Sequence, residues 1–193
     1  MHQLLADIRA CRLCADRFAA TETEHAPRPV LRAQPSARLL IAGQAPGMKV
    51  HHSGLPFTDP SGDRLRDWLG LDSETFYDES RVAIVPMAFC FPGYRKGSDL
   101  PPPPICARTW RRQVIEALPK IQLTVLVGGY AQKWHLGVKT GVTETVTRWR
   151  DFSPAALPLP HPSWRNTAWL KRNPWFEAEL LPVLRTRVAE VLA

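Results

Sequence analysis

The chain of 193 residues is 45% hydrophobic and 22% charged, which is the composition of an ordinary globular protein. No apolar run approaches the roughly 20 residues that a membrane span requires, and the N-terminal residues lack the basic and then apolar order of a secretion signal. The formal net charge of +7 favours a polyanionic partner such as nucleic acid. We expect a cytoplasmic monomer with one domain, residues 1–193, and no membrane partner.

The N-terminal segment, residues 2–18, has apolar residues at helical spacing and predicts one helix. Cys11 and Cys14 lie one turn apart near its end. Residues 21–36 include three prolines and few apolar side chains, so we expect an irregular connection to the first strand. His25, within this connection, is expected to be exposed.

Apolar runs at residues 39–42, 82–85 and 123–127 predict buried parallel strands. Helical patterns lie between these runs and in the closing segment, residues 174–192. Strands that alternate with helices predict an α/β three-layer sandwich around a short, mainly parallel four-stranded sheet, with the strand-end loops on one face.

Two segments and one proline do not follow this alternation. Residues 91–104 are expected to form a long loop, stiffened into a polyproline-like run by its prolines. Residues 140–150 are rich in threonine and valine, which indicates an edge hairpin. Pro86 is expected to mark the end of the second strand, because proline cannot donate to a central ladder.

Two turns rich in glycine and proline follow the first strand, at residues 43–47 and 54–58. Either turn alone is most simply an ordinary loop. Ligands of open α/β sheets, however, bind just beyond strand ends, and the second turn brings an aromatic ring, Phe57, toward the same edge. The two loops and the ring suggest a slot for a flat ligand.

The four cysteines form two pairs, Cys11 with Cys14 and Cys90 with Cys106. In a reducing cytoplasm this pattern favours a metal or cluster site over disulfide bonds. A redox-active C-x2-C pair is the alternative. The spacing does not distinguish zinc from iron–sulfur.

Arginines gather in two places. Arg108, Arg111 and Arg112 form one group, which fits a solvated helix face as well as a DNA contact. The second group, Arg165, Lys171 and Arg172, alternates with tryptophans. Stacking and phosphate contact usually occur together in nucleic-acid sites, so we expect the second group to bind DNA.

These features resemble the uracil-DNA glycosylase superfamily, most closely its iron–sulfur branch, called family four. The resemblance rests on GQAPG at residues 43–47, SGLPF at 53–57, the cysteine quartet and HPS at 161–163. It implies excision of uracil or a related deaminated base from DNA in base excision repair, by hydrolysis of the N-glycosidic bond. It also implies that the cysteines hold a structural [4Fe–4S] cluster.

The resemblance assigns roles to several residues. His161 would stabilise the departing base, although a turn-capping histidine is the simpler interpretation of an isolated His-Pro pair. Phe57 would stack on the flipped base, or serve as a core residue. The related enzymes with the highest efficiency have a water-orienting aspartate at the position of Ala45. Asp59 and His51 are the candidates for that role, with a helix cap as the alternative for Asp59.

Base recognition departs from the family pattern. Gln44 and the backbone of Ala45 would line the base pocket, but Pro86 occupies the position of an asparagine that reads the base. We therefore expect a broader range of deaminated bases. A non-catalytic nucleic-acid-binding or sensing module with a structural metal cluster is the alternative function.

The segment after HPS is expected to contact DNA, with Trp164, Arg165 or Asn166 as a wedge in the minor groove. Trp169 and Trp175 are expected to pack under the last helix instead. The predicted DNA-contacting residues are Ser163, Trp164, Arg165, Asn166, Lys171 and Arg172.

Overall fold

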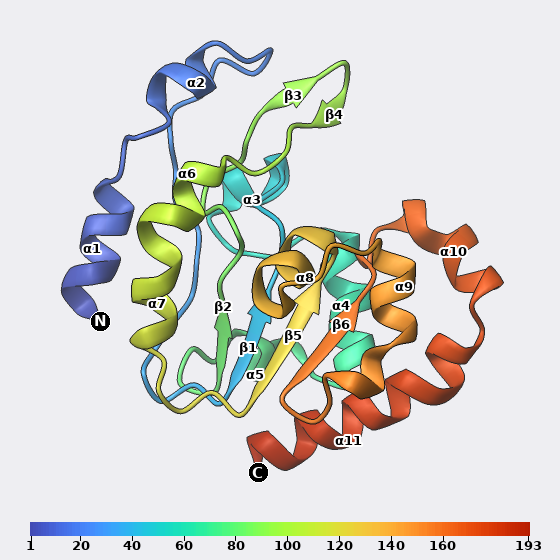
Figure 1. Cartoon of the computed structure of the whole chain (residues 1–193). Helices are drawn as coiled ribbons and strands as arrows, with labels where there is room; N and C mark the ends of the chain where they lie inside the picture. The colour runs from blue at the N-terminus through green and yellow to red at the C-terminus, as the bar shows by residue number, and fades with distance from the viewer.

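The computed structural model describes residues 1–193 and is built on a four-stranded sheet with the order β2-β1-β5-β6. All of its neighbouring strands pair in parallel, as predicted from the alternation of strands and helices. The strands are β1 Leu39–Ala42, β2 Val82–Ile84, β5 Leu123–Val127 and β6 Ala156–Leu159. Their carboxyl ends lie at one edge of the sheet, toward which the arrows point upward in Figure 1.

Side chains alternate between the two faces of the sheet, and this alternation builds two cores. Leu39 and Ile41 of β1 point into the larger core, whereas Leu40 between them points into the smaller one. The larger core is closed by α4 (Pro60–Leu69) and α11 (Leu181–Leu192), and the smaller one by α1 (His2–Ala10) and α7 (Arg112–Glu116) (Figure 1). The result is the three-layer α/β sandwich that the sequence predicts.

The remaining elements cover the sheet or extend its edge. The α-helices are α1 His2–Ala10, α2 Ala15–Ala19, α3 Met48–Ser53, α4 Pro60–Leu69, α5 Ser73–Tyr77, α6 Pro104–Cys106, α7 Arg112–Glu116, α8 Gly129–Leu136, α9 Val142–Thr147, α10 Thr167–Arg172 and α11 Leu181–Leu192. Shorter turns of other helix types are η1 Ala107–Arg111, η2 Trp149–Asp151, η3 Trp164–Asn166 and η4 Phe176–Leu180. None of the helices is long and apolar enough to cross a membrane.

The helix predicted over residues 2–18 is divided in the structure. The first part, α1, ends at Ala10, because Cys11 adopts an extended conformation with ψ of 132°. The second part, α2, starts at Ala15. Leu13, in the intervening turn, is 60% exposed, so the two cysteines lie in a loop rather than on one helical turn.

The prediction of an edge hairpin over residues 140–150 is wrong. This segment forms α9 and η2, and it buries Val146 and Trp149, three residues apart. Burial of that helical face overrides the strand preference of threonine and valine. The sheet instead ends at β6, where Pro158 is tolerated because β6 pairs on one side only.

The proline-rich segment contains a hairpin that the sequence analysis did not predict. β3 (Tyr94–Arg95) pairs antiparallel with β4 (Ser98–Asp99). Lys96 and Gly97 both have positive φ, of 51° and 70°, as a two-residue hairpin turn requires. The hairpin projects from the carboxyl edge of the sheet (Figure 1), and it brings Asp99 back toward that edge.

Candidate active site

One pocket at the carboxyl edge of the sheet collects most of the predicted site residues. It is lined by Gln44, Ala45, Phe57, Asp59, Pro86 and His161. These residues come from the segments that follow β1, β2 and β6. The predicted shared cavity for Phe57 and His161 is therefore present.

The first loop, residues 43–47, is held by hydrogen bonds from the segment that follows β2. The amide of Met87 donates to the carbonyl of Gly43 over 2.9 Å, and that of Ala88 to the carbonyl of Gln44 over 3.1 Å. A Cβ on Gly43 would lie 3.5 Å from the ring of Phe57, so this ring lies directly against the loop backbone.

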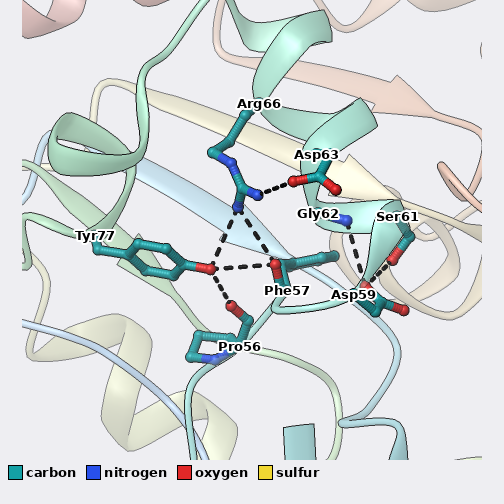
Figure 2. Close-up of polar contacts among 8 residues, drawn as sticks. All are labelled: Pro56, Phe57, Asp59, Ser61, Gly62, Asp63, Arg66 and Tyr77. Carbon is teal, nitrogen blue, oxygen red and sulfur yellow. Dashed lines mark hydrogen bonds and ion pairs between the residues drawn. The ribbon is translucent and has the colours of Figure 1, made fainter. Parts of the chain in front are cut away.

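Phe57 is held in an uncommon backbone conformation, with φ of +56°. Its carbonyl oxygen lies 3.3 Å from Nη1 of Arg66 and 3.2 Å from the Tyr77 hydroxyl, which also lies 2.8 Å from the Pro56 carbonyl (Figure 2). Asp63 in turn pairs with Arg66 at 2.6 Å. These contacts fix a strained residue whose ring lines the pocket.

Asp59 is the N-cap of α4, where its Oδ1 accepts from the Gly62 amide at 3.3 Å and from the Ser61 hydroxyl at 2.6 Å (Figure 2). The helix-cap interpretation is thus confirmed. The same carboxylate also lines the pocket, so the cap does not exclude a second role for it.

His161 follows β6 within two residues. Its Nδ1 accepts from the Ser163 amide at 3.2 Å, which places the proton of the neutral ring on Nε2. Burial lowers the pKa of His161 below its ordinary value, against the opposing charge of Asp59. A neutral imidazole with a free N–H donor therefore faces the pocket.

Asp99 also lines this pocket, and the sequence analysis missed it. Burial raises the pKa of its carboxyl group, Arg165 opposes this shift, and Asp59 adds to it. The Lys-Gly pair at residues 96 and 97 is the one signal that could have indicated the hairpin that carries Asp99.

His51 does not line the pocket, contrary to its prediction as a catalytic candidate. It lies on α3 with its ring 5.0 Å from that of His25 and 6.0 Å from that of Phe91. His25 is not exposed as predicted, because it hydrogen-bonds the Phe91 carbonyl at 2.9 Å and stacks on Phe18. These rings pack against one another outside the pocket.

Comparison with known families agrees with this geometry. The family model of the uracil DNA glycosylase superfamily matches residues 32–185. The chain belongs to this superfamily. It is also similar to the solution NMR structure of a candidate uracil DNA glycosylase from Methanosarcina acetivorans, with 17% identity and a TM-score of 0.47, over 80% of this chain and 93% of that one.

The superfamily match includes every pocket residue of this glycosylase-like chain except Val30, whereas Cys11 and Cys14 precede it. The structure nevertheless brings all four cysteines to one cavity of otherwise mainly apolar residues. All four are free and partly buried. No three histidine, cysteine or acidic side chains are arranged to hold a single metal ion.

The surroundings of the cysteine sulfur atoms suit a metal centre that is bound by thiolates. The Phe89 amide donates to Sγ of Cys106 at 3.4 Å, and the backbone amide of Arg28 favours the thiolate of Cys90 by lowering its pKa. Amide donors of this kind stabilise sulfur ligands. Without a metal, burial raises the thiol pKa of Cys90 to about 12 and of Cys106 to about 11, so both would be neutral.

Only some side chains of the segment expected to contact DNA are exposed and able to do so in this superfamily member. Trp164 is 74% exposed, and the guanidinium of Arg165 lies 5.9 Å from its ring. Lys171 and Arg172 are exposed. Asn166 instead donates its side-chain amide to the His161 carbonyl at 2.7 Å, so it supports the catalytic candidate.

The other aromatic and basic predictions have mixed outcomes. Trp169 and Trp175 pack against the larger core near the last helix, as predicted. In the first arginine group, Arg108 and Arg112 are exposed, whereas Arg111 is completely buried. Arg111 therefore lies neither on a solvated helix face nor where it could contact DNA.

Proposed function

We propose that this protein is a monofunctional DNA glycosylase that hydrolyses the N-glycosidic bond of uracil or a related deaminated base in base excision repair. The observation that carries the proposal is the shared pocket of Phe57 and His161 at the carboxyl edge of the sheet. A flipped base needs a stacking surface and a donor at the atom where negative charge develops. Phe57 and His161 supply these two groups.

His161 acts as the donor to the departing base. Its Nδ1 is occupied by the Ser163 amide, so Nε2–H is the atom available to a base carbonyl. When the glycosidic bond breaks, its electron pair leaves with the base, and the oxygen that accepts from Nε2–H gains negative charge. A neutral ring suffices, because no proton has to be transferred at this step.

Asp59 orients the attacking water and stabilises the cationic sugar. Its Oδ1 is engaged by the helix cap, which leaves Oδ2 for the water. The water adds to the anomeric carbon, and its proton is removed by the carboxylate or by solvent. Ala45 has no side chain for this task.

Base recognition depends on Gln44 and on backbone groups of the first loop. Pro86 lines the pocket at the position where an amide would read the base, and it offers no donor. A pocket with few polar contacts to the base edge discriminates weakly. Hypoxanthine and xanthine are therefore proposed substrates beside uracil.

DNA is held by the surface around η3 and α10, with Trp164 as the wedge and Arg165, Lys171 and Arg172 as phosphate contacts. Cys11, Cys14, Cys90 and Cys106 would hold a structural [4Fe–4S] cluster. Bound there, the cluster would tie the N-terminal loop to α6 and to the segment after β2, and it would supply no chemistry to the hydrolysis.

The test is excision from oligonucleotides that contain uracil, hypoxanthine or xanthine, in single and double strands. The expected result is alkali-sensitive strand cleavage by the purified protein and its loss in His161→Ala. The matched control is His52→Ala, because His52 is exposed. DNA binding without base release from any substrate would contradict the proposal and favour the non-catalytic module.

A further inference from the structure

Arg111 is a buried cation in the smaller core region of the protein. It is 0% exposed, although a charged side chain is rarely buried without a partner of opposite charge. It forms no ion pair with a carboxylate; the arginine ion pairs of the structure involve other arginines.

The groups that contact Arg111 are all neutral. Nη1 donates to the carbonyls of Val85 at 3.1 Å and Pro86 at 2.8 Å, and Nη2 lies 2.5 Å from Nε2 of His135. The ring of Trp134 lies 5.0 Å from the guanidinium carbon. Nε has no hydrogen-bond partner.

His135 cannot supply the missing negative charge. Burial and the positive charge of Arg111 lower the pKa of His135 to about 3, so its ring is neutral and accepts from Nη2. Uncompensated burial also lowers the pKa of Arg111 to about 10. An unpaired buried charge is costly, so a nearby anion would stabilise this arrangement.

The cysteines are the candidates for that anion. Cys106 is the N-cap of the π-helical turn η1 and Arg111 is its last residue, and π-helical hydrogen bonds join residues five apart. A thiolate at Cys106 opposes the loss of the Arg111 proton. No three of these side chains are arranged for a single ion, whereas four thiolates around an oxidised [4Fe–4S] core retain roughly two net negative charges.

We propose that Arg111 is the buried counter-charge of a thiolate-ligated metal centre held by the four cysteines. This inference rests on metal ligation by the cysteines, and not on excision of a base. Arg111 is a positioning residue that favours retention of the centre. Because its Nη1 also holds the carbonyl of Pro86, which lines the base pocket, it connects the centre to the wall of the pocket.

The test compares Arg111→Gln, which removes the charge, with Arg111→Lys, which keeps it. Arg112→Gln is the matched control, because Arg112 is the next residue and is exposed. Iron, zinc and sulfide per chain and the rate of metal loss to a chelator are measured for each protein. We expect Arg111→Gln to lose metal on the order of 10-fold to 100-fold faster, with wild-type rates for Arg112→Gln and a smaller change for Arg111→Lys.

A second measurement separates charge from packing. If the centre is iron–sulfur, its midpoint potential should become more negative in Arg111→Gln, because removal of a nearby positive charge disfavours addition of an electron. If Arg111→Gln is recovered only as aggregate, the metal content of Arg111→Lys decides, and full content supports the proposal.

Four outcomes would overturn it: a wild-type protein without iron or zinc, an Arg111→Gln protein with unchanged metal retention, an unchanged midpoint potential, or equal metal loss in Arg111→Gln and Arg111→Lys. None of these measurements uses excision. Failure of this proposal is therefore distinguishable from failure of the proposed glycosylase activity.

Discussion

The carbonyl oxygen of Phe57 lies 1.8 Å from the position that a Cβ atom on Gly62 would occupy. The first turn of α4 therefore packs directly on the backbone of the residue proposed to stack on the base. Glycine is required here for close approach and not for a special φ angle. The helix that Asp59 caps and the ring of Phe57 are thus positioned by one contact.

Gly62→Ala should displace Phe57 and destabilise the protein by about 1–3 kcal/mol, because overpacking forces the backbone to shift. Excision should slow as well, since the ring loses its place in the pocket. Urea unfolding and single-turnover excision measure the two effects. Gly141→Ala is the control, because a Cβ there would meet nothing within 4 Å and its φ is −72°; equal stability of the two variants would contradict the close approach.

The pH dependence of excision should report the neutral form of His161. Its folded-state pKa lies below the ordinary value of 6.5, so the neutral ring persists as the pH falls through 6.5. We expect a rate that is constant above pH 6.5 and decreases only at lower pH. The same shift lowers stability below pH 6.5, because the unfolded chain binds more protons there. A rate that rises as the pH is lowered below 6.5 would indicate an imidazolium donor instead.

Asp59→Asn should separate the helix cap from catalysis. The asparagine Oδ1 can still accept from Gly62 and Ser61, as Asp59 does, so the unfolding free energy should change little. Loss of the carboxylate should slow excision about 100-fold or more. Circular dichroism melting and single-turnover excision give the two values; unchanged excision would remove Asp59 from the mechanism and direct attention to Asp99.

Trp164→Ala should leave stability unchanged, because this side chain is 74% exposed. If Trp164 is the wedge, uracil in duplex DNA should be excised more slowly, whereas uracil in single strands should be affected less, since no stacked pair has to be opened. Val183→Ala, an exposed apolar position on α11, serves as the control. Equal losses on both substrates would contradict the wedge.

Tyr77→Phe should loosen the support of the Phe57 backbone. The hydroxyl lies between the carbonyls of Pro56 and Phe57, and its removal should cost about 1 kcal/mol of stability. Excision should decrease with it. Tyr130→Phe is the matched control, because Tyr130 is 45% exposed. A Tyr77→Phe protein as stable and active as the control would show that this hydroxyl is dispensable.

The sequence by itself predicted the elements whose signal is local. Apolar runs identified β1, β2 and β5, and the Gly-Pro turns with HPS identified the loops that line the pocket, because parallel strands bring their carboxyl ends to one edge. The prediction failed for residues 140–150, where threonine and valine favour a strand but burial of Val146 and Trp149 produces a helix. Local propensity cannot anticipate which face of a segment the rest of the chain will cover.

Only the tertiary structure decided which charged groups meet. Asp99 enters the pocket through a hairpin closed by two residues, His51 turns away to pack on His25, and Arg111 leaves the exposed group of its neighbours for the core. Each outcome depends on contacts between residues distant in the chain, and the energy of a charge is set by the groups packed around it. Motifs that resemble the superfamily implied the chemistry proposed for this protein, and packing determined which side chains lie in the pocket.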